Sequence, residues 1–472
     1  MANVVSSDAK PALDYLSAAF RPPAYDARLS DTKYQYFFPI TGVKDTNCLR
    51  FSIPHQHGKF VPNIEKMVLA LDVKVTNRSR TSTPPVGIES GPCNNFVNSL
   101  FKSLRIFYNT EPVVKLEWFQ VYNYVRLLLN ADDNDLNTWA ETRCFYKEGQ
   151  MEELDNINTA GWNARRNCFG AVVKGPPKIK NQSGAEVSNP NLNKFMYSER
   201  SNFFVTLLEH YLPSQPLLKN VDVSVELELN KPEAVFHSKD LSADNVDINF
   251  DFDRVRLFVP KVKLNDKLFL SLNDRLAKEA MRQFFTSTRI NTHTISAGNK
   301  TATIDNVATG FMPSRMYLMV VETDRHTDFT KNSLKFPRLY NSKNPGEAFY
   351  LQDVKVTLDG DVVEGLACDK SVHSFRDEYF RLCHLTNQDI GKNGFSVTYR
   401  DFQHHFCVLV YDFTASLNAT EYPLLPTVKS GHIRVELTFS SETTVPLTLI
   451  TMSELQSSLT LEDSGKCTLS QI

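Results

Sequence analysis

Length, composition and charge limit the classes of protein to which this chain can belong. With 472 residues, a formal net charge of −2 and a sequence pI of about 6.6, it is not expected to coat nucleic acid with a basic surface. Its 42% hydrophobic and 22% charged residues are typical of a globular protein with more than one domain, and no apolar run is long enough to span a bilayer.

The first 32 residues are expected to form an arm outside the folded body. They lack the basic start and apolar core of a signal peptide, so we expect synthesis inside the cell. Pro11 is tolerated in the first turn of a helix, and a weak helix from Pro11 to Phe20 is therefore compatible with this segment.

From Lys33 onward, most of the chain is predicted to form short strands with alternating or continuous apolar residues between turns. The clearest strands are Met67–Val75, Ser103–Tyr108, Phe203–Leu208, Val221–Leu229, Arg254–Val259, Arg315–Val321, Val354–Leu358, Phe406–Tyr411 and His432–Phe439. The predicted helices are Glu117–Asn130, Ser271–Gln283 and Lys370–His384. The fold class is therefore all-β, with a few short helices in loops.

An internal repeat relates the two halves of the chain. Phe60–Pro62 matches Phe311–Pro313 at a spacing of about 250 residues, and each motif precedes a long apolar strand. The later strand motif Val223–Leu229 matches Ile433–Phe439 at a shorter spacing. The first half therefore carries an insertion of roughly 40 residues or more, placed at about 131–200, whose composition is typical of a surface loop.

Two tandem jelly rolls fit this repeat. A jelly roll is a sandwich of eight strands built from two Greek keys, and two of about 200 residues each match the chain length. We expect an N-terminal arm at 1–32, a first jelly roll at 33–249 with the insertion at about 131–200, a second jelly roll at 250–454, and a C-terminal tail at 455–472.

Five segments carry a resemblance to a known family: Asn94–Leu129, Arg254–Leu264, Ala308–Glu322, Phe406–Leu417 and Gly431–Glu454. They include the strand entry Asn98–Phe101, the G-x-x-P-S-R motif of Gly310–Arg315, and the G-x-x-R-x-E-L-x-F motif of Gly431–Phe439. In the order and spacing of these motifs the chain resembles the double jelly-roll major capsid proteins of the adenovirus-like lineage, in particular those of Polinton (Maverick) elements and adintoviruses.

The resemblance implies a structural protein of the virion and no enzyme. It implies a homotrimer whose six sandwiches give a pseudo-hexagonal outline, with trimer–trimer contacts in an icosahedral shell and with penton and minor capsid proteins as further partners. It implies no catalytic, cofactor-binding or metal-binding residue and no specific binding of nucleic acid. Whether the protein assembles in the nucleus or the cytoplasm of the host is left open.

Four segments were weighed as sites of chemistry. His55 and His57 point to one face of a strand but have no evident third metal ligand, and His404 and His405 point to opposite faces. The acidic run at 131–135 lacks the glycine and distal glutamate of a calcium loop, so a solvated turn is expected. Lys174–Lys180 with Arg165 and Arg166 forms a small basic patch in the insertion, read as a solvated loop.

Two other functions remain open from the sequence. A carbohydrate-binding or glycan-hydrolysing β-sandwich protein is compatible with the aromatic and acidic content, although no pair of carboxylates stands out. A minor capsid or vertex protein is the second alternative. The internal repeat argues against it, because a fivefold vertex needs one sandwich per subunit.

Overall fold

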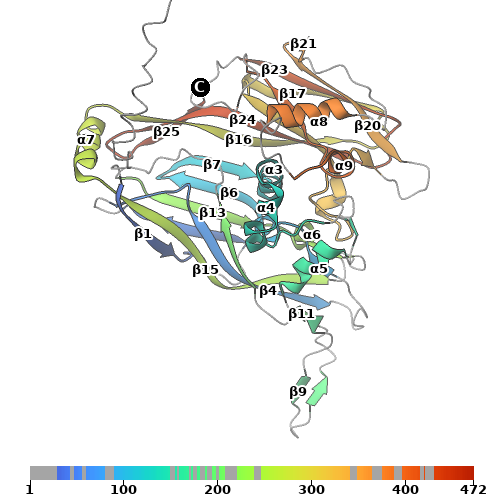
Figure 1. Cartoon of the computed structure of the whole chain (residues 1–472), viewed down its shortest axis with the longest axis horizontal. Coiled ribbons are helices and arrows are strands. Elements are labelled where there is room, and N and C mark those ends of the chain that lie inside the picture. The colour runs from blue at the N-terminus through green and yellow to red at the C-terminus, as the bar shows by residue number, and fades with distance from the viewer. Residues whose placement is uncertain are drawn as a thin grey trace, which may run out of the picture.

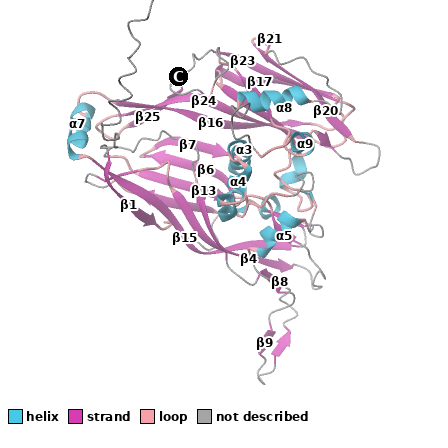
Figure 2. Cartoon of the chain, viewed as in Figure 1, coloured by secondary structure: helices cyan, strands magenta, loops and turns pink. Residues whose placement is uncertain are grey.

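Strands dominate the molecule, and its four large β-sheets follow one another from the bottom to the top of Figure 1, with two further two-stranded sheets among the described residues. The helices are short and lie in the connections between strands (Figure 2). The structure is a computed structural model that describes residues 29–471 except for 43–46, 56–59, 80–89, 149–154, 157–158, 170–171, 174–177, 181–185, 189–193, 198–200, 208–219, 239–245, 341–347, 364–374, 387–395, 415–418 and 420–429.

The first sandwich consists of two antiparallel sheets. Its first sheet has the strand order β1 (Leu29–Phe37), β15 (Val246–Leu264), β4 (Val68–Ser79) and β12 (Ser201–Thr206). Its second sheet has the order β2 (Cys48–Ile53), β13 (Val223–Leu229), β6 (Phe101–Tyr108) and β7 (Glu111–Glu117). The short strands β3 (Phe60–Pro62), β11 (Lys194–Tyr197) and β8 (Val172–Val173) extend the first sheet.

The second sandwich repeats this arrangement. Its first sheet has the order β16 (Met281–Ile295), β24 (Leu447–Leu461), β18 (Arg315–Glu322) and β22 (Leu409–Asp412), and β25 (Cys467–Gln471) pairs with β24. Its second sheet has the order β17 (Thr301–Phe311), β23 (Ser430–Phe439), β20 (Phe349–Leu358) and β21 (Asp361–Val362), with β19 (Leu339–Tyr340) beside β20.

The two sandwiches have the same topology strand for strand. When the eight principal strands of each sandwich are numbered in chain order, the first sheet has the order 1, 8, 3 and 6 in both sandwiches, and the second sheet has the order 2, 7, 4 and 5 in both. Eight strands in two four-stranded antiparallel sheets with these crossing connections form a jelly roll. The predicted repeat and the predicted all-β double jelly roll are both confirmed.

Alternation of apolar and polar residues explains why these segments form the faces of a sandwich. In β4 the side chains of Leu69, Leu71, Val73 and Val75 are buried, and they point to one face because successive residues of a strand alternate. Val225 in β13 follows the same rule on the facing sheet. Each such side chain contributes roughly 1.5–3 kcal/mol when it leaves water, so the two facing rows are the main source of stability.

Two of the three longer helices occupy equivalent positions in the two sandwiches, and the third links the sandwiches. The helix α3 (Phe119–Asn130) follows β7, α8 (Arg376–Leu385) follows β21, and α7 (Asp266–Leu276) connects the sandwiches. The first confirms the predicted helix Glu117–Asn130 to within two residues, and the second confirms the later part of Lys370–His384, whose residues 370–374 lie outside the described residues. The third begins earlier than predicted, because the Asn265 side chain accepts a hydrogen bond from the Lys267 N–H and caps the helix, while Met281–Gln283 belongs to β16.

The remaining elements are short. They are α2 (Phe96–Ser99), α4 (Asp133–Leu136), α5 (Ala160–Asn167), α6 (Pro232–Val235), α9 (Tyr399–His404), the 3-10 helices η1 (Trp139–Arg143) and η3 (Thr323–His326), and the strands β5 (Ser90–Pro92), β9 (Lys178–Lys180), β10 (Glu186–Ser188) and β14 (Phe236–Ser238).

Three of the described strands run across predicted boundaries between the parts of the chain. The predicted limit at 249/250 falls inside β15, which pairs in the first sheet on both sides of that point. Within the predicted tail at 455–472, β24 runs on to Leu461 and β25 adds an antiparallel partner to it. The last residues of the predicted arm belong to β1, which begins at Leu29.

The insertion at about 131–200 is not only a surface loop. Trp162 in α5 is 1% exposed, and its ring lies within 3 Å of the position that a Cβ on Gly91 would occupy. Arg165, predicted as part of a solvated basic patch, is buried and forms an ion pair with Glu148 at 2.7 Å. Part of the insertion therefore belongs to the core, while the β9–β10 hairpin projects from the molecule (Figure 1).

We expect Trp162→Ala to destabilise the protein by about 3–5 kcal/mol, because it removes a large buried side chain and leaves a cavity. The measurement is urea unfolding followed by far-ultraviolet circular dichroism, because this backbone signal does not depend on the tryptophan that is removed. Phe311→Ala, at a side chain that is 50% exposed, is the control and should change the free energy of unfolding by less than about 0.5 kcal/mol. Equal effects of the two changes would show that the insertion does not contribute to the core.

Candidate assembly surface

The two sandwiches meet at a joint, which we define as the contacts of β7, α3 and β14 with the second sandwich. The strand β7 runs along β16 and β25, and its Glu111 Oε1 accepts a hydrogen bond from the Leu469 N–H at 3.3 Å. The Ser238 N–H of β14 donates to the Phe329 carbonyl at 2.7 Å. The second sheet of the first sandwich therefore faces the first sheet of the second sandwich (Figure 1).

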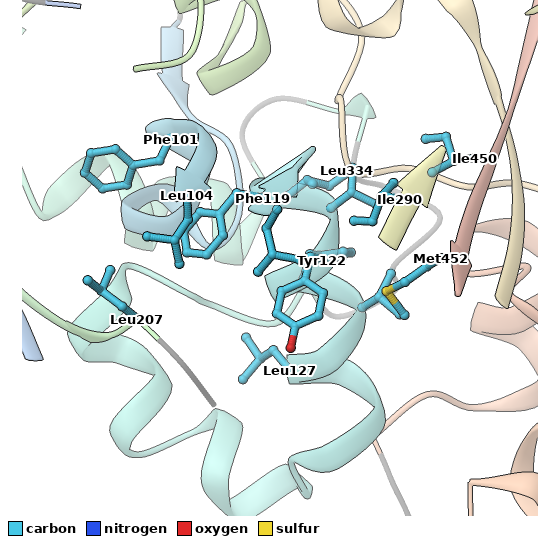
Figure 3. Close-up of a cluster of buried hydrophobic side chains, with 14 of the residues drawn as sticks. Phe101, Leu104, Phe119, Tyr122, Leu127, Leu207, Ile290, Leu334, Ile450 and Met452 are labelled. Atoms are coloured by element: carbon cyan, nitrogen blue, oxygen red, sulfur yellow. The ribbon is translucent and has the colours of Figure 1, made fainter. Parts of the chain in front are cut away.

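Apolar side chains fill the centre of the joint. Figure 3 shows Phe119 and Tyr122 of α3 between Phe101 and Leu104 of the first sandwich and the second-sandwich side chains Ile290, Ile450 and Met452. All of these side chains except Ile290 are at most 1% exposed. Ten of the twelve residues of α3 are buried, the polar Gln120 and Asn123 among them, so the helix is covered on nearly all sides, unlike a helix on a protein surface.

A buried ion cluster lies beside this apolar centre. Glu454 of β24 accepts from the Arg126 guanidinium of α3 through one carboxylate oxygen and from Arg315 Nε through the other, at 3.0 Å. The Tyr317 hydroxyl also donates to this carboxylate, at 3.4 Å. Burial disfavours the charged form of Glu454, but the two guanidinium groups outweigh it and lower the pKa to about 2.

A second ion cluster ties the insertion to the second sandwich. Asp155 accepts from Arg325 Nη1 at 2.9 Å, from Lys335 Nζ at 2.7 Å and from the Asn332 N–H at 3.0 Å. Burial opposes the charge on Asp155, but Arg325 and Lys335 outweigh it and hold the pKa below its usual range. Opposite charges therefore link the two sandwiches at two places, once within the joint and once between the insertion and the second sandwich.

Three buried histidines also lie at the joint. The His237 ring Nε2 donates to the Thr330 carbonyl at 3.1 Å, and the His405 ring Nε2 lies 3.2 Å from the Tyr124 hydroxyl. His326 packs edge-on against Trp118, with ring centroids 4.6 Å apart. Burial, with help from nearby cations such as Arg325, lowers the pKa of all three rings, and that of His326 to about 4.

A different surface of the first sandwich is apolar and exposed. In β1, Tyr34 and Tyr36 are 71% and 56% exposed and alternate with less exposed residues, so they share the outward face; just beyond the strand, Phe38 and Ile40 are 63% and 71% exposed. Tyr36 pairs with Phe258 of β15, whose ring lies 6.3 Å away, and Phe258 pairs with Val68 of β4.

A further exposed aromatic side chain lies at the other edge of the sheet, beyond Arg256. In β12, Phe204 is 45% exposed and pairs with Ala70, which in turn pairs with Arg256 of β15. We call this surface, made by Tyr34, Tyr36, Phe38, Ile40, Phe204 and Phe258, the first outer face. Exposed apolar patches that span several strands mark sites of interaction with another surface.

The residues weighed as sites of chemistry do not come together. His55 Nδ1 lies 2.9 Å from Asp222 Oδ1, while His57 lies outside the described residues. His404 and His405 differ in burial, as expected for residues that point apart. Asp132 caps the short helix α4 through the Asp135 N–H at 2.8 Å, which matches the predicted turn rather than a calcium loop. Of Lys174–Lys180, no side chain is described.

Sequence reasoning missed the charged residues of the joint. Arg126 and Glu454 each stand alone in an apolar segment, YVRLLL and LITMSEL. A lone charge in a segment that is otherwise buried calls for a partner of opposite sign, and this was the available signal. Among the residues with a described position, no group of three or more His, Cys, Asp or Glu could hold a metal ion.

Comparisons with known proteins place the fold among viral capsid structures. No family model and no curated protein sequence matches the chain. The structure of the Sputnik virophage matches with a TM-score of 0.63 and 12% identity over 96% of this chain and 90% of the other. The Faustovirus major capsid protein matches at 0.59, with 12% identity over 96% and 94%, and the PBCV-1 virus capsid at 0.53, with 11% identity over 96% and 99%.

These matches span nearly the whole chain, so both sandwiches and their connection are shared. They agree with the double jelly-roll fold that the strand order shows. None of the helices in the described part of the chain is long and apolar enough to cross a membrane.

We expect Glu454→Gln to destabilise the protein by about 3–5 kcal/mol at pH 7, because it leaves two buried guanidinium groups without their counter-charge. Urea unfolding measures the loss. The control is Glu226→Gln, which breaks the more exposed pair with Arg50 and should cost at most about 1 kcal/mol. A loss for Glu454→Gln no larger than that of the control would contradict a tight ionic joint.

The buried histidines predict a joint that weakens in mild acid. A histidine whose folded pKa is lowered stabilises the protein fully above its unfolded pKa of about 6.5 and progressively less as the pH falls toward its folded pKa. For His326 this window runs from about 6.5 to about 4, above the range in which Glu454 titrates. Each such histidine adds a slope of up to ~1.4 kcal/mol per pH unit.

His326→Phe tests this directly, because neither nitrogen of this ring has a hydrogen-bond partner among the described residues. The variant should be at least as stable as the parent at pH 7. Between pH 6 and 4.5, its free energy of unfolding should fall less steeply with falling pH than that of the parent, by ~1.4 kcal/mol per pH unit. Urea midpoints across this range give the slopes. Parallel curves for parent and variant are the result that contradicts the prediction.

Proposed function

We propose that this chain is a major capsid protein, a structural building block that forms homotrimers and tiles an icosahedral shell. The observation that carries the proposal is the duplicated jelly roll joined through unlike faces. In the joint, the second sheet of one sandwich faces the first sheet of the next. A contact between unlike faces is heterologous, and its repetition between copies forms a closed ring when the rotation permits.

The number of sandwiches explains why a trimer suits a shell. Three copies supply six similar sandwiches, so their ring has a nearly hexagonal outline, and hexagonal outlines fill a surface without gaps. The structural similarity to the Faustovirus major capsid protein and to the PBCV-1 virus capsid supports this proposal. We propose that the units run from β1 to β15 and from β16 to β25, with α7 as their link.

The proposed function needs no chemistry beyond association. The protein is a component of the virion rather than an enzyme, and it carries no catalytic, cofactor or metal site. Its partners are copies of itself within the trimer, neighbouring trimers in the shell, and penton or minor capsid proteins. The net charge of −2 agrees with a shell that does not bind nucleic acid through its whole surface.

Light scattering on the purified protein, with electron microscopy of the same sample, tests the proposal. We expect a mass near three times 53.7 kDa and particles with a hexagonal outline or shells. A clean monomer at all concentrations, or open filaments of undefined mass, would contradict it. Dilution to nanomolar concentration serves as the control that separates a stable trimer from concentration-driven aggregation.

A further inference from the structure

Two cysteine side chains meet at the end of the helix α5. Cys168 is the C-cap residue of α5, and its N–H donates to the Arg165 carbonyl at 3.3 Å. Cys144 ends η1, and its thiol donates to the same carbonyl at 3.8 Å. The Cys168 thiol donates to the neighbouring Ala164 carbonyl at 3.5 Å, and the two thiols are in hydrogen-bond contact with each other. Both cysteines are reduced in this structure.

The two thiols differ in access to solvent and in ionisation. Cys144 is fully buried, whereas Cys168 is partly exposed. Hydrogen bonds from the Cys144 thiol and from the Tyr146 hydroxyl, 3.4 Å away, stabilise the thiolate of Cys168 and lower its pKa, although burial opposes this. Burial raises the pKa of Cys144. An accessible thiol that ionises readily beside a buried thiol is the arrangement of an attacking and a resolving cysteine.

We propose that Cys144 and Cys168 are a modification site, at which a low-molecular-weight disulfide such as oxidised glutathione introduces a reversible disulfide bond. The Cys168 thiolate attacks one sulfur of the reagent, forms a mixed disulfide and releases one glutathione thiolate. Cys144 then gives its proton to solvent, and its sulfur attacks the sulfur of Cys168 and displaces the second glutathione thiolate. The chain loses two electrons, and one oxidised glutathione becomes two reduced ones.

The bond closes residues 144–168 of the insertion into a ring. Asp155 lies in this ring and binds Arg325 and Lys335 of the second sandwich at 2.9 and 2.7 Å. A crosslink that closes such a loop restricts the unfolded chain and thereby stabilises the folded one. In an oxidising medium the insertion is therefore clamped where it reaches the second sandwich. The disulfide needs neither trimers nor a shell, so its test is independent of the proposed function.

Peptide mapping of the full chain tests the bond. The protein is incubated with millimolar oxidised glutathione, the remaining thiols are blocked with iodoacetamide, and trypsin digestion is followed by mass spectrometry without reduction. We expect the tryptic peptides 144–147 and 167–174 to be joined, and to separate after treatment with dithiothreitol. Alkylation of both cysteines after oxidation, or linkage of either to a third cysteine or to another chain, overturns the inference.

Single substitutions test the two roles. Cys144→Ala removes the resolving thiol, so glutathione should stay on Cys168 as a mixed disulfide. In Cys168→Ala, glutathione should not attach to the buried Cys144. Glutathione on Cys144 rather than Cys168 overturns the assignment of roles. Cys48→Ser, at a partly exposed thiol of β2, is the matched control and should leave the linkage unchanged. Mapping of the parent chain stays decisive if either buried-site variant fails to fold.

Tyr146→Phe tests how Cys168 is activated. In the parent, alkylation of Cys168 by iodoacetamide should reach half its maximal rate below the ordinary cysteine pKa of about 8.5. Loss of the hydroxyl should move that midpoint upward and slow the reaction at least about 3-fold at pH 7, with equal rates in strong alkali. A rate lowered equally at every pH, or not lowered at all, overturns the activation of Cys168 by Tyr146.

Thermal unfolding of oxidised and reduced protein tests the clamp. Oxidation should raise the midpoint of the parent by at least about 3 °C, and dithiothreitol should reverse the rise. Cys168→Ala should show no difference between the two conditions. A joined pair of peptides with an unchanged midpoint overturns the stabilising role of the bond.

Discussion

The buried carboxylate of Glu454, held between Arg126 of α3 and Arg315 of β18, is the interaction on which the shape of the molecule depends. Apolar contacts supply most of the free energy at the joint, but they tolerate sliding because they have no direction. A buried ion pair tolerates almost no sliding, because a charge that loses its partner is left in the interior without water or a counter-charge. The ion cluster therefore fixes the position of one sandwich against the other more strictly than the apolar contacts do.

Duplication produced two sandwiches with one topology and two different environments. The helix α3 is buried nearly all round because it lies between sandwiches, whereas its counterpart α8 keeps an exposed stripe that includes Phe380. In the same way, the outer face of β16, β24 and β18 is covered, while the aromatic side chains of β1 are exposed. Equivalent elements thus differ in exposure because their surroundings differ, although their topology is the same.

The buried histidines are expected to make the stability of the joint depend on pH. His237, His326 and His405 are neutral at the boundary of the sandwiches, and they lie near the cluster of Asp155, Arg325 and Lys335, whose ionic contacts persist to lower pH. Mild acid therefore acts on the histidines before it reaches the ion pairs. We therefore expect the joint to be stable near neutral pH and to weaken as these histidines become protonated.

The sequence by itself determined the strands, the repeat and the two-sandwich fold, because period-two alternation depends only on local residues such as Leu69, Leu71 and Val73. It did not reveal that β15 continues past residue 249, nor that the Ser-rich end of β24 forms a strand that pairs with β16 and β25. Only the tertiary structure decided which charges meet, as Arg126 and Glu454 lie 328 residues apart. Which apolar faces are covered was likewise decided by packing between sandwiches, which no local pattern encodes.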